Sequence, residues 1–241
     1  MLSPQTIAIV TLILFSSSLV RSSLGFGDAL VAMPFLTMLF DSYTAAAFFS
    51  MATLSVAIYI LWHNWRDVNL GDGWRLIVGG FIGIPLGLTI LHNLPESTIL
   101  MALGIILIGY GLYNLLTPLM PQLKTETYSF VFGFFAGLLG GAYNVHGPPL
   151  VVYGSLRRWS PEQFRVTLQS YFLPAGLFVL FGHIRAGSLT IDSLKLCIIV
   201  QPAVIGATIL GGYLNHRIPH TEFKRIIYVF LVIIGVYMIV P

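Results

Sequence analysis

The chain has 241 residues, of which 56% are hydrophobic and only 9% are Asp, Glu, Lys or Arg. Since roughly a quarter of the residues in a typical soluble domain are charged, this composition excludes an ordinary water-soluble fold. The net charge of +3 comes from basic residues spread through short loops, so we predict no nucleic-acid partner. The lone cysteine, Cys197, lies in an apolar run and offers neither an intramolecular disulfide nor a thiolate metal site.

Hydrophobic runs of about the 18 to 20 residues needed to cross a bilayer core recur along nearly the whole chain. In chain order, the predicted segments are 5–23, 27–40, 43–62, 74–92, 97–116, 127–141, 147–156, 162–183, 193–213 and 222–240. We therefore predict an all-α integral membrane protein with about eight to ten transmembrane or re-entrant helices. No loop is long enough to form a soluble domain.

Two of these segments, 27–40 and 147–156, are short, and each follows a Gly-rich break in the apolar pattern. The first break is Gly25-Phe26-Gly27-Asp28, and the second runs from Gly140 to Gly147. Such segments either cross the bilayer incompletely, as the returning arms of re-entrant hairpins, or cross it as short helices. The sequence leaves both possibilities open.

Basic residues are distributed unequally between the connections. Numbered in order, the even connections hold only Arg185 and Lys195, whereas the odd ones hold Arg66, Arg75, Lys124, Arg157, Arg158, Arg165, Arg217, Lys224 and Arg225. Cytoplasmic loops carry the excess of Lys and Arg, so the odd connections are predicted to be cytoplasmic. We expect a multi-pass protein of the cell (inner) membrane with both termini on the periplasmic or extracellular side.

The two halves of the chain, 1–120 and 121–241, match when they are laid over one another. The matched positions are Leu24-Gly25 with Leu139-Gly140, Pro34 with Pro149, Gly111-Leu112-Tyr113 with Gly235-Val236-Tyr237, and Gly79, Gly83 and Gly87 with Ala203, Ala207 and Gly211. Small residues four apart allow helices to approach closely in lipid. Since each half contains an odd number of crossings, we predict two inverted-topology repeats within one membrane domain.

The two breaks are the candidate substrate site. A broken helix in a membrane persists only where it faces protein or a water-filled cavity, and a helix that starts there directs its positive end inward. This arrangement favours an anion, although the glycines could instead permit only tight turns or packing. The candidate substrate-binding residues are Gly25, Phe26, Gly27, Asp28, Gly141, Tyr143, Asn144, His146, Gly147 and Gln169.

Three stretches carry a family resemblance: Leu24 to Pro34, Gly140 to Gly154, and Trp159 to Arg165. Their sequences LGFGDALVAMP, GGAYNVHGPPLVVYG and WSPEQFR resemble the paired motifs of the sulfite exporter TauE/SafE family of membrane permeases. The resemblance spans the whole chain and implies proton-gradient-driven export of sulfite or related sulfur-containing organic anions. One departure is His146, where the family generally has a small or polar residue.

Ionisable residues near the breaks are the candidates for proton coupling. An intramembrane carboxylate is costly, so Asp28 is a candidate for binding the coupling proton, with capping of the following helix or pairing with Arg21 as the structural alternatives. His146 could shuttle protons or serve as a structural hydrogen-bond donor. For Arg21 we expect a cytoplasmic anchor, with pairing to Asp28 or binding of the anion as alternatives.

Other classes of function find less support. A membrane-embedded enzyme would need a nucleophile and base or a metal cluster, and neither a G-x-S-x-G nor an H-E-x-x-H motif occurs. A passive anion channel remains the second alternative. We therefore predict a secondary transporter that uses no cofactor or metal, with a small anion, protons and the lipid bilayer as its partners, and leave its oligomeric state open.

Overall fold

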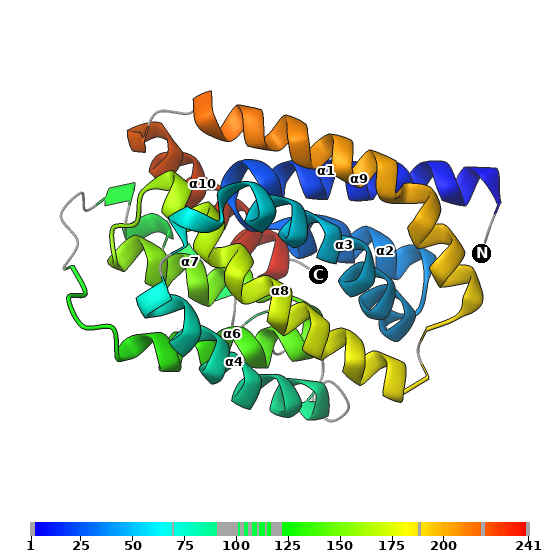
Figure 1. The fold of residues 1–241 in the computed structure, drawn as a ribbon, viewed down its shortest axis with the longest axis horizontal. Coiled ribbons are helices and arrows are strands. Elements are labelled where there is room, and N and C mark those ends of the chain that lie inside the picture. The colour runs from blue at the N-terminus through cyan, green and yellow to red at the C-terminus, as the bar shows by residue number, and fades with distance from the viewer. Residues whose placement is uncertain are drawn as a thin grey trace.

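The computed structural model of the chain is a bundle of helices (Figure 1). It describes residues 3–68, 70–90, 101, 104–105, 108–109, 111–113, 115–116, 122–187, 189–217 and 220–239. Within these ranges every regular element is helical and no strand occurs, which confirms the predicted all-α class.

The helices follow the apolar runs closely. Their bounds are α1 Pro4–Leu24, α2 Asp28–Leu39, α3 Ser42–Asn64, the short 3-10 helix η1 Trp65–Asp67, α4 Leu70–Ile90, α6 Tyr128–Tyr143, α7 Gly147–Leu156, α8 Pro161–Arg185, α9 Ile191–Arg217 and α10 His220–Ile239. Each α-helix begins and ends within four residues of its predicted segment. The segment predicted at 97–116 lies largely outside the described residues.

Four of these helices, α1, α3, α8 and α9, are long and apolar enough to cross a bilayer. By contrast, α2 has 12 residues and α7 has 10. At a rise of about 1.5 Å per residue they reach about 18 and 15 Å, well short of the roughly 30 Å hydrocarbon core. The two short segments therefore do not cross the bilayer by themselves.

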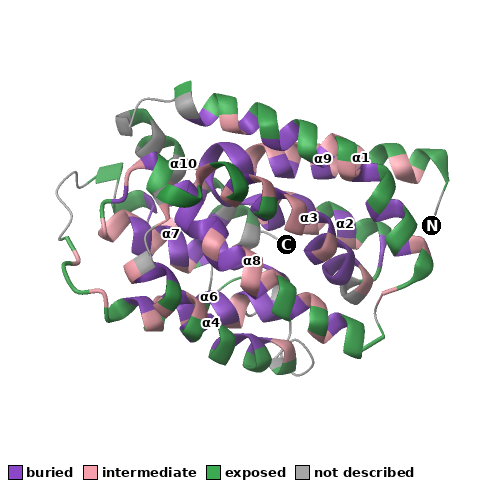
Figure 2. Cartoon of the chain, viewed as in Figure 1, coloured by how far each residue is buried: buried purple, intermediate pink, exposed green. Residues whose placement is uncertain are grey.

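Apart from the two breaks, which lie inside the bundle, connections with the same predicted sidedness gather at the same end (Figure 1). The α3–α4 and α7–α8 connections, the segment before α6, the end of α9 and the start of α10 lie at one end. The start of α1 and the α2–α3 and α8–α9 connections lie at the other. We call the first of these ends the α7–α8 end. Apolar side chains such as Leu12, Phe81 and Ile198 are exposed on the outer faces, while buried residues fill the centre (Figure 2).

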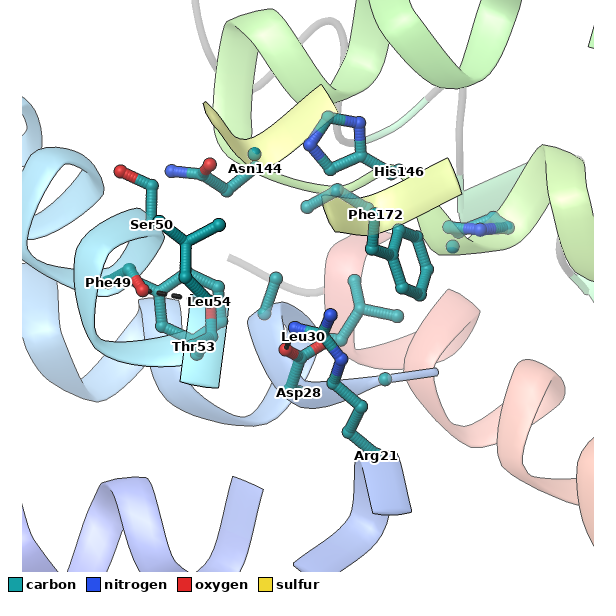
Figure 3. A pocket seen from close by; sticks show the side chains of 16 residues that line it. Arg21, Asp28, Leu30, Phe49, Ser50, Thr53, Leu54, Asn144, His146 and Phe172 are labelled. Atoms are coloured by element: carbon teal, nitrogen blue, oxygen red, sulfur yellow. Dashed lines mark hydrogen bonds and ion pairs between the residues drawn. The ribbon is translucent and has the colours of Figure 1, made fainter. Parts of the chain in front are cut away.

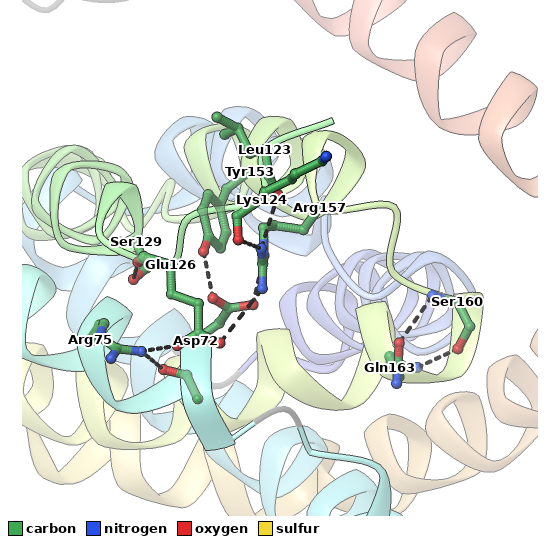
Figure 4. A network of polar contacts seen from close by, with 11 residues as sticks. Asp72, Arg75, Leu123, Lys124, Glu126, Ser129, Tyr153, Arg157, Ser160 and Gln163 are labelled. Atoms are coloured by element: carbon green, nitrogen blue, oxygen red, sulfur yellow. Dashed lines mark hydrogen bonds and ion pairs between the residues drawn. The ribbon is translucent and has the colours of Figure 1, made fainter. Parts of the chain in front are cut away.

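A polar network ties several segments together at the α7–α8 end (Figure 4). The carboxylate of Asp72, fully buried at the start of α4, accepts hydrogen bonds from Tyr153 Oη at 2.6 Å and Arg157 Nε at 3.1 Å. Arg157 also donates to the carbonyls of Leu123 and Lys124. Since Tyr153 and Arg157 lie on and directly after α7, this network fixes the short helix to α4.

Helices α4 and α6 touch backbone to backbone. Three glycines on each helix, spaced four apart, face a carbonyl oxygen of the other helix; they are Gly79, Gly83 and Gly87 on α4 and Gly133, Gly137 and Gly141 on α6. A Cβ atom at any of them would lie 2.1 to 2.4 Å from that oxygen, so only glycine permits this approach. The row of glycines spaced four apart on α4 was expected from the sequence to allow a close helix contact, but the corresponding row on α6 was not.

The contacts between helices occur in matching pairs. The α4–α6 contact corresponds to the α9–α1 contact, and the α1–α2 contact corresponds to the α6–α7 contact. In the same way, α2–α3 corresponds to α7–α8, and α3–α9 corresponds to α8–α4. Helices α3 and α8 pack against each other. The contact between α1 and α9 is also close, because a Cβ at Gly211 would lie 2.8 Å from the carbonyl oxygen of Leu19.

The α4–α6 contact generates a stability prediction. A Gly83→Ala substitution would place Cβ 2.1 Å from the carbonyl oxygen of Phe134, so the helices must separate. Overpacking of this kind costs about 1–3 kcal/mol, and we expect a lower melting temperature in detergent. Gly206→Ala is the matched control, since no atom lies within 4 Å of a Cβ there. Equal melting temperatures for the two variants would contradict the close contact.

Candidate functional site

The first break is built from two glycines in the left-handed backbone region. Gly25 has φ +91° and ends α1 by donating its N–H to the carbonyl of Arg21 at 2.7 Å. Gly27 has φ +95° and directly precedes α2, which begins at Asp28. Side chains are strained at such φ values, so glycine is required at both positions. The chain thus reverses within three residues and starts a new helix in the interior.

The second break uses an asparagine in the same conformation. Asn144 has φ +58°, which asparagine tolerates better than most residues, and its N–H bonds to the carbonyl of Gly140 at 2.8 Å. Its side-chain Nδ2 donates to the carbonyl of Ala46 on α3 at 3.0 Å. Asn144 therefore ends α6 and fixes the break to α3, and α7 begins three residues later at Gly147.

Both helix starts line one pocket (Figure 3). Arg21 and Asp28 lie on one side of it and Asn144 and His146 on the opposite side. Of the sequence candidates, the structure brings together Gly27, Asp28, Asn144, His146 and Gly147 around this pocket. Helices that start about 120 residues apart in sequence therefore direct their positive ends toward the same space.

The charged group of the pocket is a buried ion pair. Arg21 Nη1 lies 2.7 Å from Asp28 Oδ2, and the two side chains are only 6% and 9% exposed. The guanidinium also lies 4.8 Å above the centre of the Phe172 ring. Our expectation that Arg21 anchors α1 at the membrane surface is wrong. Arg21 occupies the last turn of α1, which ends at the break inside the protein and not at the surface.

Gln169 holds this arrangement without lining the pocket. Its Oε1 accepts a hydrogen bond from Arg21 Nε at 2.9 Å, and its Nε2 donates to the carbonyl of Gly25 at 2.9 Å. Its side chain is fully buried on α8. One amide thus fixes both the orientation of the guanidinium and the backbone of the first break.

His146 forms the opposite wall. It is 8% exposed, and its Nδ1 lies 3.2 Å from the carbonyl oxygen of Ala136, which can only accept. Nδ1 therefore carries the proton in this hydrogen bond, and Nε2 is left as the atom that could accept another. A Cβ at Gly140 would lie 1.8 Å from Nδ1, so the imidazole occupies space that only glycine leaves open.

The remaining sequence candidates lie around the pocket and not in its lining. Gly25 forms the turn, the buried Phe26 ring packs edge-on against Phe164 and Phe230, and Gly141 lies against the Ile84 carbonyl of α4. The side chain of Tyr143 lies outside the described residues. These residues shape the backbone and its packing around the site.

Sequence reasoning missed two polar residues of the lining. Ser50 and Thr53 of α3 face the pocket, and their hydroxyls donate to the carbonyls of Ala47 and Phe49 within the helix. A hydroxyl oxygen that donates in this way can still accept a hydrogen bond. Their spacing of three within an otherwise apolar run was the available signal, because it places both on one helix face.

The close fit of His146 to Gly140 yields a double-mutant prediction. Gly140→Ala should lower the melting temperature in detergent, because Cβ collides with the imidazole. In the His146→Ser background the same substitution should cost less, by about 0.5–3 kcal/mol of coupling energy. Additive effects in this cycle would contradict the contact.

Comparisons with known proteins agree with the transporter prediction. Residues 9–238 match the family described as Sulfite exporter TauE/SafE. A relative named Probable sulfite/organosulfonate exporter TauE, from Cupriavidus necator, is 27% identical over 206 residues, covering 82% of this chain and 79% of that protein. No solved structure matches. The chain is thus a membrane transporter and not an enzyme, and it belongs to the sulfite exporter TauE/SafE family.

Proposed function

We propose that the chain carries a small sulfur-containing anion, sulfite or an organosulfonate, outward across the membrane. The observation that carries this proposal is the guanidinium of Arg21, buried between two inward-directed helix starts. Guanidinium groups bind planar and tetrahedral oxyanions through several parallel hydrogen bonds. Sulfite and organosulfonates are the substrates named for the Cupriavidus necator relative.

Neutral hydrogen-bonding groups complete the proposed anion site. Ser50 and Thr53 of α3 and the break residue Asn144 surround the pocket with no additional charge. A transported anion must bind firmly enough to enter and weakly enough to leave. One cation with several neutral groups suits that requirement better than a cluster of cations, which would hold a dianion tightly.

Asp28 makes anion binding dependent on a proton. Arg21 is already paired with this carboxylate, and a buried cation and two anions in one pocket would be strongly disfavoured. An anion can replace the carboxylate at Arg21 if Asp28 takes up a proton. Proton uptake and anion binding then favour each other, so the proton travels with the anion and not against it.

His146 is the second candidate for the coupling proton. Its Nδ1 is engaged with the Ala136 carbonyl, which leaves Nε2 to accept a proton. A charged His146 would add a second cation to the wall opposite Arg21. This route would also strengthen anion binding at low pH, and substitution separates it from the route through Asp28.

We further propose that residues 1–120 and 121–241 are two inverted repeats that rock against each other around the pocket. The matching pairs of helix contacts support this, since exchanging α1, α2, α3 and α4 with α6, α7, α8 and α9 reproduces them. Each half contributes one break to the pocket, as expected for a site at a repeat interface. The excess of basic residues at the α7–α8 end supports a cytoplasmic location for that end.

The function is tested by flux into proteoliposomes with a trapped pH indicator. Sulfite uptake should saturate, should be accelerated by sulfite on the opposite side, and should move protons in the same direction. Chloride should compete weakly, because it offers no set of oxygen acceptors to the guanidinium. Flux that rises linearly with concentration and lacks acceleration would favour a passive anion channel.

The role of Asp28 is tested with the Asp28→Asn variant and a sulfonate that stays ionised across the pH range. In the wild type, affinity should rise up to about tenfold for each unit by which pH is lowered while Asp28 is ionised. In Asp28→Asn the affinity should be high and nearly independent of pH. Asp192→Asn, in the first turn of α9 and away from the pocket, should keep the wild-type slope. If the pH dependence of the affinity were unchanged in Asp28→Asn, the coupling proton would be assigned to His146 instead.

A further inference from the structure

A second guanidinium, that of Arg165, is buried near the pocket without an ion-pair partner among the described residues. Arg165 lies in the second turn of α8 and is 4% exposed. Its Nε has no hydrogen-bond partner, and within the described residues no carboxylate lies within ion-pair distance of it. Burying an unpaired cation is strongly unfavourable, so such a group needs a reason to persist.

The surrounding backbone leaves room for this side chain. A Cβ at Gly212 of α9 would lie 3.2 Å from Arg165 Nη2 and 3.8 Å from Cζ, so the guanidinium rests on the bare backbone of α9. A Cβ at Gly25 would lie 3.1 Å from the Cα of Arg165, which places the first break directly against this turn of α8. The guanidinium is therefore built into the contact of α1, α8 and α9.

A second polar group in this region is also unsatisfied. Asn215, three residues after Gly212 on α9, is 1% exposed and donates its Nδ2 to the carbonyl of Ser23 at 2.7 Å, but its Oδ1 has no partner. Buried polar atoms are nearly always paired, and unpaired ones commonly mark the place of a water or an ion.

Arg165 is aligned with the pocket along one face of α8. Arg165, Gln169 and Phe172 follow each other at a spacing of four and three residues, which places them on one stripe. Gln169 bonds to Arg21, and Phe172 lies under the Arg21 guanidinium. Phe172 is the first residue of α8 in the pocket lining, so Arg165 lies about two helical turns, roughly 10.5 Å along the axis, closer to the α7–α8 end than the pocket does.

We propose that Arg165 is a second anion-binding station, which receives a small oxyanion from the α7–α8 end and passes it to Arg21. This inference rests on the proposed function, since it assumes that the pocket carries an anion. The two stations differ in one respect: Arg21 forms an ion pair with Asp28 until a proton neutralises the carboxylate, whereas Arg165 has no ion-pair partner within the described part of the chain. Arg165 thus binds the anion first, and binding at Arg21 follows in the proton-dependent step.

The test is a sided transport measurement on Arg165→Gln in vesicles of defined orientation, with sulfite as the probe. Accessibility of a Lys124→Cys variant to an impermeant thiol reagent identifies the α7–α8 end, since Lys124 is exposed there. We expect KM measured from that end to rise at least about tenfold, the loss expected for a charge-assisted hydrogen bond. From the opposite side, KM should change less than twofold. A role confined to folding would move both values together.

A gentler variant covers the case in which Arg165→Gln does not fold. Gly212→Ala should displace the guanidinium and raise KM from the same end by a smaller factor, whereas Gly206→Ala on the same helix should leave it unchanged. An unchanged KM, or an equal rise of KM on both sides, would contradict the proposal that Arg165 binds the anion at the α7–α8 end. Absence of saturable flux in the wild type would instead refute the proposed function itself.

Discussion

The buried pair of Arg21 and Asp28 sets the conditions for the rest of the pocket. Burying the Arg21 guanidinium is costly, and Asp28 offsets that cost with an opposite charge from the first turn of α2. The geometry of the pair depends on the break between them, because Gly25 and Gly27 turn the chain so that residues seven apart face each other. Gln169 then fixes both the cation and the turn. The ion pair therefore depends on the glycine turn, and Gln169 stabilises both.

The way the helices pack explains how such a site fits into a small protein. Glycine ladders bring α4 and α6 into backbone contact, and Gly211 does the same for α9 against α1. These contacts do not depend on large interlocking side chains, so space near the centre is left for the breaks and their polar groups. Polar groups that are unusual in lipid, including Asp72 and Gln169, are buried between helices and paired there.

Much of the fold was predictable from the sequence because the lipid solvent demands long apolar runs. The start of α8 also has a local cause in the sequence, since Ser160 and Gln163 form a capping box there. The breaks were predictable because glycine and asparagine mark left-handed turns. The burial of Arg21 was not, since the same residue near a helix end also fits a surface anchor. The positions of Ser50, Gln169 and Arg165 depend on which helices pack together, and an isolated sequence does not carry that information.

The ion pair also has an electrical consequence. If a monovalent anion replaces the carboxylate while Asp28 becomes neutral, the net charge of the pocket is the same when empty and when loaded. The membrane potential, worth about 2.3 kcal/mol per charge per 100 mV, then does no work on the transport step. Only concentrations matter: each unit of pH gradient balances a tenfold anion gradient, or about 1.4 kcal/mol. Export through such a carrier would be driven by accumulation of the anion inside the cell and would be indifferent to voltage.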